Sequence, residues 1–221
     1  MTHPHRQLFD RELADITDNI LRLGSLVDTA IDRSIESLKN RNTTLARQII
    51  ADDANINDLR FVIEEQCLTV IATQQPMASD LRVIIAAMNI TNDIERIGDH
   101  AAGIAKTVAR MGEQPLLKPL IDIPRMAQAA RDMLKHSLSA FIARDTEMAR
   151  LIAARDDDID HLYKVIFDEL LGIMARDPDT IPRGTYLLWC AHNLERIGDH
   201  VTNIAERVIF MTTGTMKELN V

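Results

Sequence analysis

Acidic side chains four residues apart are the groups in this sequence whose spacing could bind a metal ion. One such pair, Glu95 and Asp99, lies in the segment Glu-Arg-Ile-Gly-Asp-His, and the same six residues recur 100 positions later around Glu195 and Asp199. On an α-helix, residues four apart share a face, and two like charges there repel each other by about 0.2–0.5 kcal/mol. A shared cation would remove this repulsion. The alternative is a solvated helix edge whose acids pair with a nearby arginine or lysine.

Other acidic residues are predicted to lie at the same level as these pairs. Asp28 and Asp32 are four residues apart in the first half, and Asp53 lies beside the apolar stripe of the next helix. In an up-down-up bundle, residues equally far from a shared connection lie at the same height, which places these groups within about one turn of each other. Carboxylates from several helices suit a hard cation, and a histidine would extend the choice to iron, zinc or manganese. The candidate metal ligands are Asp28, Asp32, Asp53, Glu95, Asp99, Asp156, Asp160, His192, Glu195 and Asp199.

The two halves do not offer the same set of acids. Where the first half has Asp28 and Asp32, the second half has Arg131 and Lys135. In the first half, Asn57 follows Asp53 by four residues, at the position where an acidic pair would have its second carboxylate. The first half is therefore predicted to be the more acidic site. In the second half, Arg131 and Lys135 could instead neutralise the acids, so that an ion-pair network and a metal centre are both open interpretations.

The residues that flank each motif have the spacing of amphipathic helices. Apolar residues from Ile94 to Ile104 recur every three or four positions, and the same spacing is found along most of the chain. Asn42 and Asp145 are predicted to cap the helices that follow them. The spacing predicts helices at about residues 9–38, 44–73, 79–110, 125–143, 146–175 and 183–211.

The second group of three predicted helices repeats the order of the first. The predicted fold class is therefore all-α, with two tandem, pseudo-symmetric three-helix antiparallel bundles. Residues 1–112 are predicted to form the first bundle and residues 125–221 the second. Between them, residues 113–124 are predicted to be a linker, since it contains several prolines, including Pro124, and proline obstructs helix continuation.

Composition excludes several classes of protein. The net charge of −8 argues against a nucleic-acid-binding protein, which would carry a basic face. The N-terminus has no apolar segment typical of a signal peptide, and no apolar run approaches the roughly 18 residues that span a bilayer. We expect Cys67 and Cys190 to be small buried hydrophobic residues. A cytoplasmic protein with no direct membrane insertion is the resulting expectation.

The sequence resembles the PhoU family. The resemblance depends on the doubled Glu-Arg-Ile-Gly-Asp-His motif, on Gln-Pro-Met-Ala-Ser-Asp-Leu-Arg at 75–82 and on the early pair Asp28 and Asp32, and it covers about residues 8–212. It implies the two-bundle fold and a homodimeric, non-enzymatic regulator of phosphate uptake and phosphate homeostasis. Such a protein would be cytoplasmic and peripheral to the inner membrane through its partners.

The resemblance also implies partners and cofactors. Family members connect the phosphate ABC transporter, through its nucleotide-binding subunit, to a phosphate-sensing histidine kinase, and they hold the phosphate-starvation response off when phosphate is plentiful. Some members bind iron or zinc clusters through Glu/Asp-x-x-x-Asp motifs, so iron, zinc or another divalent metal ion is the expected cofactor. Here those motifs correspond to the pairs Asp28/Asp32, Glu95/Asp99 and Glu195/Asp199. The residues that would contact partners are not identified by the sequence, although one long helical face is expected to dock.

Enzymatic alternatives find little support in the residues. Di-iron bundles use Glu-x-x-His, whereas His192 precedes Glu195 in the reverse order and only once. A phosphotransfer module could use His100 or His200, but hydrogen bonding at a helix edge is the simpler role. No P-loop, nucleophile elbow or HExxH motif is present, and no glycine-rich loop is available to bind phosphate directly.

Overall fold

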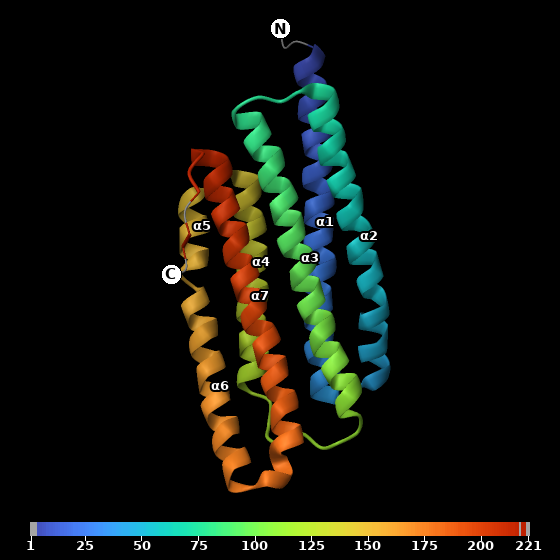
Figure 1. Cartoon of the computed structure of the whole chain (residues 1–221), viewed down its shortest axis with the longest axis vertical. Helices are drawn as coiled ribbons and strands as arrows, with labels where there is room; N and C mark the ends of the chain where they lie inside the picture. The colour runs from blue at the N-terminus through green and yellow to red at the C-terminus, as the bar shows by residue number, and fades with distance from the viewer. Residues whose placement is uncertain (1–3, 217, 220–221) are drawn as a thin grey trace.

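The structure is a computed structural model, and it describes residues 4–216 and 218–219 (Figure 1). This part of the chain contains no β-strand. It forms a short 3₁₀ helix at Pro178–Thr180 and the α-helices α1 (Pro4–Asn40), α2 (Thr43–Gln74), α3 (Ser79–Met111), α4 (Asp122–Ala143), α5 (Thr146–Ala153), α6 (Asp156–Arg176) and α7 (Ile181–Thr213).

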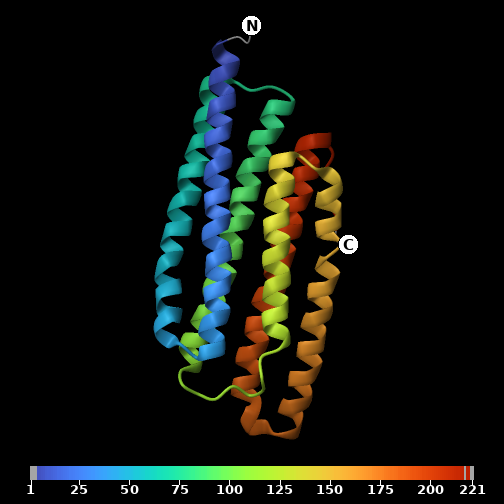
Figure 2. The same cartoon turned by 180° about the vertical axis from the view of Figure 1, so that it is seen from behind.

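The helices form two antiparallel bundles that lie side by side with their long axes nearly parallel (Figures 1 and 2). The first contains α1, α2 and α3, and the second contains α4, α7 and the collinear pair α5 and α6. The predicted all-α fold with two three-helix bundles is therefore confirmed. The boundaries predicted for the two bundles, 1–112 and 125–221, stay predictions, and their residues 1–3, 217 and 220–221 lie outside the described part.

The single helix expected over residues 146–175 was wrong, because the chain breaks between α5 and α6. Ala154 and Arg155 form a turn there, in which the Arg155 amide donates to the Ile152 carbonyl at 3.0 Å. Three consecutive aspartates, from Asp156 to Asp158, occupy the first turn of α6. Negative side chains are stabilised at a helix N-terminus by the helix dipole, which favours a new helix start at this point.

Both predicted helix caps are confirmed. The Asn42 side chain accepts a hydrogen bond from the Leu45 amide, and the Asp145 carboxylate accepts from the amides of Glu147 and Met148. These amides have no partner within their own helices, so the caps satisfy groups that would otherwise need water.

Several helices begin earlier than the sequence indicated. Helix α1 begins at Pro4 and not near residue 9, and α4 begins at Asp122, which puts Pro124 in its first turn and not in the linker. Helix α7 likewise begins at Ile181, with Pro182 in its first turn. A proline is compatible with the first turn because the amides there have no intrahelical acceptor.

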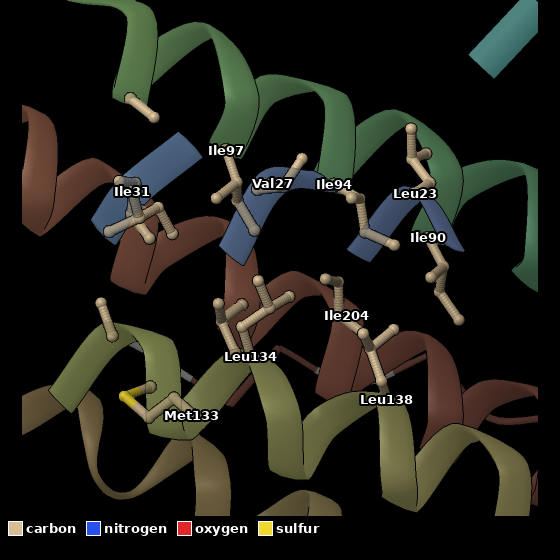
Figure 3. Packing of buried hydrophobic residues seen from close by; sticks show 14 of the residues in the cluster. Leu23, Val27, Ile31, Ile90, Ile94, Ile97, Met133, Leu134, Leu138 and Ile204 are labelled. Carbon is tan, nitrogen blue, oxygen red and sulfur yellow. The ribbon is translucent and has the colours of Figure 1, made fainter. Parts of the chain in front are cut away.

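The two bundles share one hydrophobic core, and α3 and α7 make the most extensive contact between any two helices. Figure 3 shows Ile94 and Ile97 of α3 and Val27 of α1 facing Leu134 of α4 and Ile204 of α7. All of these side chains are buried. The inner helices α1, α3, α4 and α7 therefore bury residues of both halves together, and α2, α5 and α6 lie on the outside.

Glycine allows the two bundles to approach closely at two points. A Cβ atom on Gly24 of α1 would lie 2.3 Å from Leu138 Cδ1 of α4, and one on Gly103 of α3 would lie 2.6 Å from Asn193 Oδ1 of α7. Both distances are too short for a real contact, so a side chain at either position would displace Leu138 or Asn193. Cys67 and Cys190 are buried, as predicted. No helix in the described residues has the length and apolar character needed to cross a membrane.

Replacing Ile94 with alanine should lower the free energy of unfolding by about 2–5 kcal/mol, because it leaves a cavity in the core that both bundles share. Urea denaturation followed by circular dichroism measures this change. Leu151→Ala is the control, since Leu151 is 69 % exposed and its loss should change stability by less than about 0.5 kcal/mol. Equal effects of the two substitutions would contradict the shared core.

Candidate functional site

In the first bundle, three of the predicted metal ligands act on one another electrostatically. Burial raises the pKa of the Glu95 carboxyl above its ordinary value, and the charges of Asp99 and Asp53 raise it further. The pKa of Asp53 is likewise raised, first by burial and then by Asp99. Helices α2 and α3 therefore bring Asp53, Glu95 and Asp99 together at one edge of the bundle. The helix counting predicted this group together with Asp28 and Asp32, which contact Arg131 of the other bundle.

Two arginines lie against this acidic edge. Arg60 Nε is 3.9 Å from Glu95 Oε1 and Arg96 Nε is 3.6 Å from Glu95 Oε2. Arg96 Nη1 also donates to Asp99 Oδ2 at 3.0 Å. The carboxylates of the first bundle are thus partly neutralised by cations of the same bundle.

The second bundle gathers the equivalent acids between α6 and α7. Burial raises the pKa of Glu195, the charges of Asp199 and Asp160 raise it further, and His192 acts against them. The pKa of Asp160 is raised first by burial and then by Asp199 and Asp157. His192 Nδ1 lies 3.0 Å from Glu195 Oε2, so this histidine belongs to the cluster.

Asp156 occupies a different place from the other acids of the second bundle. It is 1 % exposed, and a Cβ atom on Gly198 would lie 2.4 Å from its Oδ1 atom. The glycine of the second motif therefore makes room for the Asp156 carboxylate beneath α7. In the first bundle the equivalent Gly98 faces the apolar side chain of Ile56.

Asp28 and Asp32 contact a cation of the other bundle. Arg131 of α4 donates to Asp28 through Nε at 2.7 Å and Nη2 at 3.0 Å, and to Asp32 through Nη1 at 2.5 Å. The interpretation that Arg131 neutralises the acids of its own half was therefore wrong. Its guanidinium forms a clamp between α1 and α4, and Lys135 is exposed.

The chemistry of these side chains fits a hard divalent ion better than their arrangement does. Carboxylate oxygens are the preferred ligands of such ions, and a cation would relieve the repulsion that raises the pKa values of Glu95 and Glu195. However, no three histidine, cysteine, aspartate or glutamate side chains in the described part of the chain are grouped so that they could hold a metal ion. Binding would require side chains to turn away from their present ion pairs, and the metal ligands stay a prediction.

The histidines of the two motifs link α3 to α7. His100 Nδ1 donates to Asn193 Oδ1 at 3.0 Å, and His200 Nδ1 donates to Asp93 Oδ1 at 2.9 Å. Asn203 also donates to Asp93 at 3.1 Å, and the two imidazole rings lie 5.5 Å apart. The hydrogen-bonding role expected for these histidines is confirmed. Their partners were missed, although Asp93 and Asn193 occupy equivalent positions in the two halves.

The comparisons with known proteins agree with this architecture. The family model described as PhoU domain matches residues 20–108 and 123–208. The chain is 38 % identical over 216 residues to a phosphate-specific transport system accessory protein PhoU homolog of Clostridium acetobutylicum, covering 97 % of this chain and 99 % of that protein. It is 39 % identical over 220 residues to a homolog of the same description from Rhizobium meliloti, covering 99 % and 93 %.

Solved structures of two such proteins superpose on the chain. The crystal structure of PhoU from Pseudomonas aeruginosa has a TM-score of 0.89 at 34 % identity, covering 94 % of this chain and 100 % of that one. The crystal structure of the phosphate transport system regulatory protein PhoU from Streptococcus pneumoniae has a TM-score of 0.88 at 34 % identity, covering 95 % and 99 %. The similarity therefore extends over both bundles and not over one alone.

Replacing Glu195 with glutamine should stabilise the protein at pH 7. The pKa of Glu195 is raised above its ordinary value of 4.5 in the folded protein, so the folded protein binds the Glu195 proton more tightly than the unfolded chain does. The free energy of unfolding therefore falls as the pH rises from the unfolded-state pKa through the folded-state pKa. The gain from Glu195→Gln should therefore shrink on acidification to about pH 4, below which both states are protonated. Urea denaturation at a series of pH values measures it. An equal gain in the free energy of unfolding from Asp168→Asn, at an exposed position, would contradict the raised pKa of Glu195 as the cause.

Removing the clamp with Arg131→Met should cost about 1 kcal/mol, because its bonds are charge-assisted but the two aspartates are largely exposed. The loss should diminish in about 1 M salt, where the Debye length is only about 3 Å. Lys135→Met, one turn further along α4, is the control and should change stability by less than about 0.5 kcal/mol. Equal losses in the two variants, measured by urea denaturation, would contradict a specific role for Arg131.

Proposed function

Because the chain belongs to the PhoU family, a family of accessory regulatory proteins and not of enzymes, we propose that it regulates phosphate transport. In this role it holds the phosphate-starvation response off by connecting the phosphate ABC transporter to a phosphate-sensing histidine kinase. The observation that carries the proposal is the similarity to phosphate-specific transport system accessory proteins over nearly the whole chain.

The partners in this proposal are the nucleotide-binding subunit of the transporter and the kinase, and the protein acts as a homodimer in the cytoplasm. Its outer helices offer surface for such contacts. Val62 and Leu68 on α2 are 45 % and 57 % exposed, and the equivalent Val165 and Leu171 on α6 are 40 % and 50 % exposed. Single exposed apolar side chains are common on protein surfaces. These recur at equivalent positions of both outer helices, so we take the outer helices as the candidate surface for partners.

A divalent metal ion at the acidic edges is a second proposal, favoured by the carboxylates that raise one another's pKa values in both bundles. Such an ion would neutralise charge and so reduce the repulsion between the helices that carry these acids. In the first bundle it would be held by Asp53, Glu95 and Asp99. In the second it would be held by Asp160, His192, Glu195 and Asp199.

The regulatory function is tested in cells that lack this chain, with a reporter of the phosphate-starvation response. At high phosphate the reporter should be active without the chain and at least about tenfold lower when the chain is restored. A reporter that stays silent at high phosphate in the absence of the chain would contradict the proposal.

The metal proposal predicts that purified protein contains iron, zinc or another divalent ion by elemental analysis. The content should fall in the variants Glu95→Ala with Asp99→Ala and Glu195→Ala with Asp199→Ala, because each pair removes two oxygen ligands. Asp168→Ala, which removes an exposed acid of α6, is the control and should leave the content unchanged. Metal content that is the same in all variants would contradict a metal centre at these acids.

A further inference from the structure

The two bundles differ at one position beside their shared glutamate. Helices α2 and α6 correspond at an offset of 103 residues, and the buried pairs Ile56/Ile159 and Ile63/Ile166 confirm this register. In the same register Arg60 of α2 corresponds to Tyr163 of α6. The cation that contacts Glu95 in the first bundle is therefore replaced by an aromatic ring in the second.

Arg60 shows how a guanidinium is held at this place. Its Nη1 donates to Glu64 Oε1 at 2.5 Å, and its Nε lies 3.9 Å from Glu95 Oε1. The guanidinium carbon is also 4.2 Å from the centre of the Phe61 ring, within the range of a cation–π contact. One arginine thus pairs with carboxylates and lies over an aromatic face.

The second bundle has an aromatic surface at the equivalent place. The Tyr163 ring lies 6.3 Å from that of Phe167, tilted by 52°, and 6.1 Å from that of His192, tilted by 48°. Tyr163 therefore links a cluster of three rings on α6 and α7, which we call the platform. Phe167 is 40 % exposed, and the His192 side chain is 55 % exposed. The platform is therefore partly exposed to solvent, and it lies where α6 and α7 run side by side (Figure 1).

Glu195 adjoins this platform and lacks the arginine that Glu95 has. The Glu195 side chain is 23 % exposed, against 11 % for Glu95, which Arg60 partly covers. Arg196, its neighbour in sequence, donates to Asp199 at 2.5 Å, as Arg96 donates to Asp99. The nearest basic group to Glu195 is the imidazole of His192, whose Nδ1 lies 3.0 Å from Oε2. Glu195 is therefore a partly exposed carboxylate beside aromatic rings, at the place where Glu95 has Arg60. The rest of the surroundings differs, because Phe61 and Glu64, which hold Arg60, correspond to Lys164 and Phe167.

We propose that this platform, formed by Tyr163, Phe167, His192 and Glu195, receives an arginine side chain from a partner protein. The guanidinium lies against the aromatic rings and pairs with Glu195, as Arg60 lies over Phe61 and contacts Glu64 and Glu95 within the first bundle. This arginine and the divalent ion proposed above compete for His192 and Glu195, so the second bundle holds one of them at a time. The inference rests on the proposed function, because the occupant is taken to be a regulatory partner. Arginine fits better than lysine because its planar group can stack on a ring and pair with a carboxylate at the same time.

The test places an arginine of this chain at the site. Tyr163→Arg should place a guanidinium beside Glu195, as Arg60 is beside Glu95, and so exclude the partner's arginine, while Glu195→Gln removes the acceptor. Affinity for the purified nucleotide-binding subunit and for the cytoplasmic part of the kinase is measured by calorimetry. For whichever partner the unaltered chain binds, both variants should bind at least about tenfold more weakly. Trp189, the single tryptophan, lies one turn before His192 on α7, and its fluorescence should change on binding to the unaltered chain.

Ala175→Arg is the matched control, because it adds the same charge to α6 at an exposed position more than three helical turns from Tyr163. Its affinity should stay within about threefold of the unaltered chain, and circular dichroism should show the same helix content in all variants.

If Tyr163→Arg binds as tightly as the unaltered chain, the inference is overturned and the proposed function stands. If Ala175→Arg weakens binding as much as Tyr163→Arg, added charge and not the platform is responsible, which also overturns it. If the unaltered chain binds neither partner, the proposed function fails, and this inference fails with it.

Discussion

Helix α3 packs along α7 in the opposite direction, and this contact joins the two bundles into one body. Its apolar part includes Ile94, Ile97 and Ile204, which are all fully buried. Its polar part is the crossed pair of hydrogen bonds from His100 to Asn193 and from His200 to Asp93. Because partly buried polar groups favour the alignment in which they are paired, these bonds favour one register of the apolar faces. The position of every acid on α3 and α7 depends on that register.

The same contact explains why the doubled motif has its sequence. The isoleucine of each motif enters the core, the glycine allows close approach of the neighbouring helix, and the histidine reaches the other bundle. The glutamate and aspartate are left at the edge, where they face α2 in one bundle and α6 in the other. The isoleucine, glycine and histidine of each motif thus hold the acids of α3 and α7 in equivalent positions. The differences between the two edges come from other helices, through Arg60 on α2 and Tyr163 on α6.

Much of this could be predicted from the sequence, since apolar spacing and the internal repeat are local signals. They gave the all-α fold, the two bundles, the caps Asn42 and Asp145, and the grouping of Asp53 with Glu95 and Asp99. The break before Asp156 was missed, although three successive aspartates are a local signal for a helix start. The partner of Arg131 could not be predicted, because Asp28 is 103 residues away and the contact depends on how the bundles pack. The same limit applies to Asn193, whose hydrogen bond to His100 crosses between the bundles.

Native-state hydrogen exchange tests most directly whether α3 and α7 form one cooperative unit. If their packing joins the bundles, the slowest amides of both helices should exchange only through global unfolding and give the same free energy of opening. That free energy should match the value from urea denaturation. A value for α7 that lies several kcal/mol below the value for α3 would show that the second bundle opens independently and would contradict this account.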